Sequence, residues 1–228
     1  MHKTILIFNS EYFAAVKKYY FLAIPVIAII LSMYYFLTPI ETKPDEKITA
    51  QSLIQNGSPI MGNQNAPITI VEWGDYQCTF CYKFHQSGKD ILVEEYINTR
   101  KINFVFRDFP LNGPDSVLAA QASYCADDQG KYWEYHDEIY KNWAGERTGW
   151  VTRQSLDQFA NTIGLNLVQF NKCLDDKKYE KRVLENEKFG VKIGIKATPS
   201  FLIFNNEKIT KVEGNQPFSV FRQVIDTI

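Results

Sequence analysis

The chain has 228 residues, of which 45% are hydrophobic, enough to form the core of one ordinary domain and an additional segment. Its formal net charge is -1, so it has neither the basic field that attracts nucleic acid nor an acidic tail. Its four cysteines are too few for a small scaffold held together by disulfides.

The first feature in chain order is an uncharged, apolar run at residues 19–40. It is long enough for a membrane-spanning helix, which needs about 20 such residues. Lys17 and Lys18 precede it, so the positive-inside rule places residues 1–18 in the cytoplasm and the rest of the chain outside. The alternative is a cleaved signal peptide, whose apolar stretch is usually shorter and ends in small residues. Both interpretations place the rest of the chain in an oxidising compartment.

Residues 41–62 are polar, rich in proline and glycine, and show little periodicity. They predict an extracytoplasmic linker that joins the anchor to a folded domain at residues 63–228. This domain opens with a strand at 68–73, a helix over 79–98 and a second strand at 102–107, which together make a βαβ unit.

Helical periodicity then continues over about residues 114–188, and the chain closes with strands at 200–204 and 208–212 and a helix at 217–227. The order predicts an α/β fold in which an all-helical block is inserted into a βαβ…ββα frame.

Cys78 and Cys81 lie where the first strand gives way to its helix. A thiol at a helix N-terminus meets free backbone N–H groups and the positive end of the helix dipole, which favour the thiolate. We therefore expect Cys78 to be the attacking nucleophile and the more deeply placed Cys81 to be the resolving thiol of a redox pair.

A zinc half-site is the alternative for this segment, because His85 lies one turn beyond Cys81. A closed zinc site needs a fourth ligand, and the other cysteines are isolated and far along the chain. The sequence therefore predicts no metal at these residues.

Cys125 and Cys173 lie in the helical block without a cysteine neighbour. We expect them to form a structural disulfide, which would contribute about 4 kcal/mol in the chain-entropy model. Two buried free thiols are the alternative, since sequence alone does not determine connectivity.

These features resemble the DsbA-like branch of the thioredoxin superfamily, from about residue 63 to the C-terminus. Residues 65–81 (NAPITIVEWGDYQCTFC) look like the opening strand and active-site segment of that family, and residues 196–201 (KATPSF) look like its threonine–proline loop. The stretch from Ala119 to Tyr140 resembles its inserted helical subdomain.

The resemblance implies roles for three further residues. Pro199 should be a cis-proline, which would turn the backbone of Thr198 toward the cysteines and offer edge hydrogen bonds to a substrate segment. Glu72 matches the family's buried carboxylate, which can take a proton from Cys81. The alternative for Glu72 is a strand acid that reaches solvent.

One departure concerns the two residues between the cysteines. DsbA-like sites often carry proline or histidine there, whereas this chain has Thr79 and Phe80, which add no positive charge near Cys78. The disulfide is therefore expected to be less oxidising than in the strongest members of the family.

The sequence thus predicts a membrane-anchored thiol–disulfide oxidoreductase that needs no cofactor. The resemblance implies that it oxidises reduced or unfolded extracytoplasmic proteins and is recycled by a membrane redox partner. The alternatives are a reductase or isomerase on the same fold and a non-enzymatic copper or zinc thiol carrier.

Overall fold

A computed structural model describes Ala28, Met33 and residues 48–228 of the chain. The predicted anchor and the first residues of the predicted linker lie outside the described residues, apart from Ala28 and Met33. Within the described part of the chain, no helix combines the length and the apolar character needed to cross a membrane.

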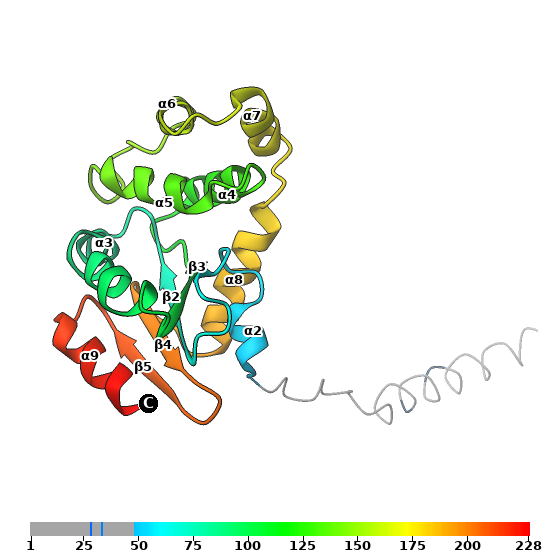
Figure 1. The fold of residues 1–228 in the computed structure, drawn as a ribbon. Coiled ribbons are helices and arrows are strands. Elements are labelled where there is room, and N and C mark those ends of the chain that lie inside the picture. Colours follow the sequence, from blue (N-terminus) through cyan, green and yellow to red (C-terminus); the bar gives the residue numbers. More distant parts are fainter. Residues whose placement is uncertain (1–27, 29–32, 34–47) are drawn as a thin grey trace, which may run out of the picture. The chain divides into compact units, whose positions relative to one another are not determined.

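A five-stranded mixed sheet forms the centre of the fold, with the strands in the order β1-β3-β2-β4-β5 (Figure 1). The strands are β1 (Met61–Gly62), β2 (Ile68–Gly74), β3 (Ile102–Asp108), β4 (Ser200–Phe204) and β5 (Ile209–Glu213). β2 pairs in parallel with β3 and antiparallel with β4, while β1 and β5 are antiparallel edge strands. The three central strands are almost entirely buried, as expected for strands covered on both faces.

Helices cover both faces of this sheet (Figure 1). One face carries α3 (Thr79–Leu92), its π-helical continuation η1 (Val93–Ile97) and α9 (Phe218–Thr227), and the other carries α2 (Ala50–Ile54) and α8 (Glu180–Lys192). Successive strand residues point to opposite faces. Ile70 therefore packs in the core with Phe84 of α3, whereas Val71 packs in a second core with Leu53 of α2.

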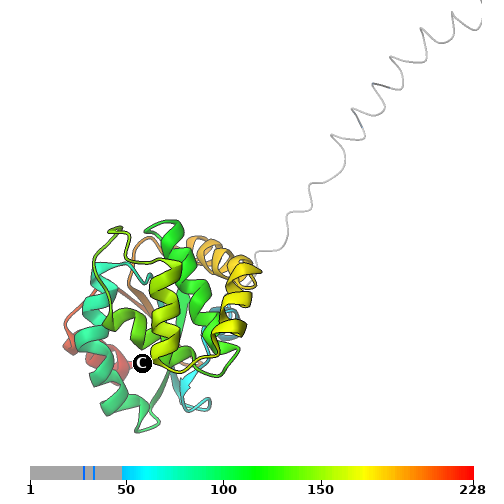
Figure 2. The ribbon, with the colours of Figure 1, turned by 90° about the horizontal axis from the view of Figure 1, so that it is seen from above.

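Four helices between β3 and α8 form a separate layer over one end of the sheet (Figures 1 and 2). They are α4 (Pro114–Asp127), α5 (Tyr132–Lys141), α6 (Arg153–Thr162) and α7 (Leu167–Asp175). α4 buries small side chains, among them Ala119, Ala122 and Ala126, which lets neighbouring helices approach closely. The structure confirms the predicted thioredoxin fold with an inserted helical block, and α8 extends past residue 188 to Lys192.

The prediction of a linker up to residue 62 is wrong for the described residues 48–62. α2 buries Leu53, which is 2% exposed, and Met61 and Gly62 pair with Phe104 and Asn103 of β3. The carbonyls of Ser52 and Leu53 also accept hydrogen bonds from Arg107. Buried Leu53, the partly buried Ile54 and Ile60 and a set of hydrogen bonds hold this segment, and these apolar residues do not recur at the spacing of a helix or a strand face.

Candidate active site

Cys78 caps the N-terminus of α3, directly after the turn that ends β2. Its Sγ accepts a hydrogen bond from the backbone N–H of Cys81 at 3.4 Å. Both thiols are reduced, and Cys78 is 5% exposed against 1% for Cys81. The arrangement gives Cys78 the better access for an incoming sulfur, and it shields Cys81.

Asp75 holds the turn between β2 and Cys78 in place. Its buried carboxylate accepts hydrogen bonds from the backbone N–H groups of Gln77 and Asn112, at 2.8 and 2.7 Å, and from the Ser116 hydroxyl at 2.6 Å. Burial raises the pKa of Asp75, and these hydrogen bonds oppose the rise. Sequence reasoning did not single out Asp75, although an acid between a buried strand and a cysteine pair is a signal that could have identified it.

The loop before β4 reaches the same site from the other end of the chain. The Thr198–Pro199 peptide bond is cis, and the carbonyl oxygen of Thr198 accepts a hydrogen bond from the Cys78 thiol at 3.3 Å. β4 is antiparallel to β2, with Ser200 opposite Trp73, and this register brings the start of β4 beside the end of β2. The chain segments before Cys78 and before Ser200 therefore meet at one edge of the sheet.

The two thiols have opposite electrostatic environments. A hydrogen bond with the Cys81 side chain, and further ones with Thr198 and the backbone of Cys81 and Phe80, lower the pKa of Cys78 from 9.0 to about 7 although burial opposes this. Burial, the hydrogen bond to Cys78 and the charges of Cys78 and Glu72 raise the pKa of Cys81 well above its ordinary value. At neutral pH the reduced pair is thus a partly ionised Cys78 and a neutral Cys81.

Glu72 lies on β2 beneath the cysteines and is 4% exposed. It shares the sheet face of Ile70, which is the face that α3 covers. Burial first, and then the charge of Cys78, raise its pKa well above the ordinary range, while the charge of Lys89 lowers it. A raised pKa favours the protonated carboxyl group, which can exchange its proton.

A second polar cluster lies between α3 and α5, where Lys89 forms an ion pair with Asp137 and the His85 Nε2 lies 3.1 Å from an Asp137 oxygen. His85, His136 and Asp137 are close enough to hold a metal ion, and among the described residues no such group contains a cysteine. The predicted alternative of a zinc half-site with Cys78, Cys81 and His85 is therefore not assembled here. Lys89 already supplies a positive charge beside Asp137.

Cys125 and Cys173 are joined by a disulfide, with their Cα atoms 5.8 Å apart. The bond connects α4 to α7 inside the buried core of the helical layer. It lies on different elements from the Cys78–Cys81 pair.

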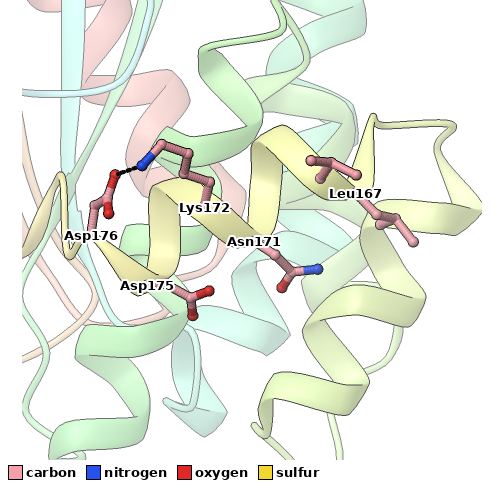
Figure 3. A pocket seen from close by; sticks show the side chains of 6 residues that line it. Leu167, Asn171, Lys172, Asp175 and Asp176 are labelled. Carbon is pink, nitrogen blue, oxygen red and sulfur yellow. Dashed lines mark hydrogen bonds and ion pairs between the residues drawn. The ribbon is translucent and has the colours of Figure 1, made fainter.

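A surface hollow in the helical layer lies on α7 and does not include the cysteines (Figure 3). It is lined by Leu167, Val168, Asn171, Lys172, Asp175 and Asp176. All belong to one helix and its C-cap, and Lys172 is paired with Asp176. Nothing in this hollow connects it with the redox pair.

Sequence reasoning also missed the loop between α5 and α6. The Trp143 Nε1 donates a hydrogen bond to the Gln77 carbonyl at 2.9 Å, and the Arg147 N–H donates to the Gln77 side chain at 3.1 Å. The loop therefore lies directly beside the cysteines. It has no periodicity, and its partner lies more than sixty positions away, so no local signal indicates this contact.

Comparison with known proteins places these features in a wider group. A family model described as Thioredoxin matches residues 55–227. The chain is 28% identical to the disulfide bond formation protein D of Bacillus subtilis (strain 168) over 170 residues, which cover 73% of this chain and 75% of that protein. It is 29% identical to a putative protein-disulfide oxidoreductase of Rickettsia bellii over 172 residues, or 72% of this chain and 64% of that protein.

Solved structures show the same similarity. Oxidised BdbD from Bacillus subtilis matches with a TM-score of 0.68 at 25% identity, covering 76% of this chain and 93% of that one. Wolbachia pipientis alpha-DsbA1 matches with a TM-score of 0.68 at 27% identity, covering 78% and 95%.

Proposed function

This chain belongs to the thioredoxin family, within its DsbA-like branch of protein thiol–disulfide oxidoreductases, and we propose that it is a dithiol oxidase acting outside the cytoplasm. The observation that supports this direction is the similarity to the disulfide bond formation protein D of Bacillus subtilis (strain 168). The pKa of Cys78, lowered to about 7 beside a neutral Cys81, acts in the same sense. Stabilising the Cys78 thiolate stabilises the reduced pair, and a couple whose reduced form is stabilised is the better oxidant.

In the proposed reaction a substrate thiolate attacks Cys78 of the Cys78–Cys81 disulfide. The S–S bond breaks, the electron pair goes to Cys81, and a mixed disulfide between the substrate and Cys78 forms. A second substrate thiolate then attacks the substrate sulfur, and Cys78 leaves as a thiolate. The substrate loses two electrons and the cysteine pair gains them, so a membrane redox partner must remove them in each cycle.

The equilibrium reduction potential of the pair tests this proposal. The full chain, purified in detergent, would be equilibrated with glutathione redox buffers and its free thiols counted after alkylation. A potential toward about -120 mV, where strong oxidants lie, supports a dithiol oxidase. A potential near about -270 mV, as in thioredoxin, would exclude it and favour a reductase or isomerase on this fold.

We propose that Thr198 and Pro199 bind the substrate segment that carries the attacking thiol. Thr198 lies within hydrogen-bonding distance of Cys78, on the loop that leads into β4. An extended peptide beside this loop would meet backbone groups that can pair with it as in an added strand. The substrates that fit this mode are reduced or unfolded proteins.

We propose that Glu72 transfers the proton of Cys81. Glu72→Gln keeps the shape but cannot give a proton to the departing Cys81, so we expect formation of the mixed disulfide to slow by about a hundredfold, the lower end of what a positioned acid–base group contributes. Stopped-flow oxidation of a dithiol peptide would measure this rate.

The same variant should be more stable at neutral pH. Because the pKa of Glu72 is raised in the folded state, its stability penalty appears as the pH rises above the ordinary carboxyl value of 4.5. Glu72→Gln removes that penalty, so its melting temperature at pH 7 should rise. A variant that is both slow and less stable would indicate a structural role instead.

We propose that residues 19–40 anchor the chain, with residues 1–18 in the cytoplasm and the catalytic domain outside. The support is the uncharged run itself and the lysines that precede it. Protease treatment of intact cells should remove the domain from membranes. Release of the domain without its N-terminal segment into the medium would indicate a cleaved signal peptide instead.

A further inference from the structure

The loop between α5 and α6 brings an acidic residue to the helix end that carries Cys78. Glu146 accepts a hydrogen bond from the backbone N–H of Thr79 at 2.7 Å, and Thr79 is the first residue of α3. The preceding residue, Gly145, has a φ of +109°, a backbone conformation that residues with a side chain rarely adopt. The contacts of Trp143 and Arg147 with Gln77 hold the loop on both sides of Glu146.

This contact places two anions at one helix N-terminus. The free N–H groups of the first turn stabilise negative charge there. The Cys78 thiolate depends on these N–H groups, because neither Thr79 nor Phe80 adds a positive charge beside it. The backbone N–H of Cys81 already donates a hydrogen bond to Cys78 Sγ. Glu146 occupies the neighbouring N–H and adds a like charge, which disfavours the thiolate.

We propose that Glu146 is a positioning residue that competes with the Cys78 thiolate for the N-terminus of α3 and makes the Cys78–Cys81 disulfide less oxidising. Reduction adds two electrons to the disulfide and leaves Cys78 partly as a thiolate and Cys81 as a thiol. A group that destabilises this thiolate destabilises the reduced form, so it lowers the reduction potential of the pair. The inference rests on the proposed function only in requiring that Cys78 and Cys81 form a redox couple.

The test compares Glu146→Gln with the unchanged chain. Glutamine still accepts the hydrogen bond from Thr79 but carries no charge, so the loop contact is retained. We expect the thiolate-to-thiol ratio of Cys78 to rise by about three- to tenfold at the pH of the original midpoint, the size expected for one partly screened charge nearby. The absorbance of the thiolate as a function of pH measures it.

The reduction potential of the Cys78–Cys81 pair should rise as the Cys78 thiolate becomes more stable. The same glutathione titration of the full chain at pH 7 should place Glu146→Gln about 10–20 mV above the unchanged chain, because Cys78 is only about half ionised there and a tenfold change in the equilibrium constant is about 30 mV. Because Glu146 is exposed, salt near 1 M should remove most of this difference.

Glu207→Gln is the matched control. It removes the same charge from the exposed turn between β4 and β5. That turn follows Phe204, which pairs with Thr69 near the start of β2, whereas Cys78 follows the other end of β2. We expect this control to keep the potential of the unchanged chain.

Equal potentials for Glu146→Gln and the unchanged chain, or equal shifts in both variants, would overturn the inference. A shift toward a less oxidising pair would also overturn it. The absolute potential of the unchanged chain tests the proposed oxidase, whereas only the difference between variants tests Glu146, so the two can fail separately.

Discussion

Cys78→Ser should reduce thiol–disulfide exchange to the uncatalysed background, whereas Cys81→Ser should trap mixed disulfides that the protein cannot release. Cys78 is the more exposed of the two cysteines, its pKa is about 7, and it lies beside Thr198 of the proposed substrate loop. Cys81 is shielded, and its pKa lies well above its ordinary value. Only Cys78 is placed to bond with a substrate sulfur, and Cys81 is the thiol of this chain that can break that bond when no second substrate thiolate does.

The two serine variants form a matched pair, because each removes one sulfur atom from the N-terminal turn of α3. Incubation with a peptide disulfide, whose S–S bond the Cys78 thiolate opens, followed by non-reducing electrophoresis, would reveal the mixed disulfide with Cys81→Ser and none with Cys78→Ser. The reverse result would exchange the roles of the two cysteines. Equal and partial activity of both variants would exclude a dithiol mechanism.

The local part of this site could be predicted from the sequence. Residues 68–73 form an apolar run that becomes the buried strand β2, and the cysteines follow it directly, so the strand–helix junction needs only short-range information. The position of Pro199 was predicted from the family resemblance alone. Nothing in its local sequence indicates that the loop lies 3.3 Å from a thiol 120 positions earlier.

Contacts between segments without periodicity could not be predicted. Arg107 is an example, since it is the last residue but one of β3 and yet is buried. Its guanidinium donates to Asn186 of α8 at 2.8 and 3.1 Å and to the carbonyl oxygens of Ser52 and Leu53. The segment at residues 48–62 and the α5–α6 loop share this property, because their positions depend on hydrogen bonds to distant residues and on a few apolar contacts without a regular period.

Removing both Cys125 and Cys173 should destabilise the protein strongly without changing the redox couple. The disulfide closes a segment with a sequence separation of 48 residues between α4 and α7. In the chain-entropy model a loop of this length contributes about 4 kcal/mol, because the cross-link restricts the unfolded chain. At about 2–4 °C per kcal/mol for a chain of this size, the Cys125→Ala/Cys173→Ala variant should melt about 8–16 °C lower.

The potential of the Cys78–Cys81 pair in this double variant separates a structural disulfide from a second redox centre. Ser116 of α4 donates a hydrogen bond to the Asp75 carboxylate in the active-site turn. An unchanged reduction potential would therefore mean that α4 keeps its native packing without the disulfide. We expect an unchanged potential and full peptide oxidation well below the new melting temperature, because the disulfide is buried and shares no residue with the exchange site. Lost oxidation at unchanged stability would instead mean that electrons pass through Cys125 and Cys173, and the assignment of a structural bond would be wrong.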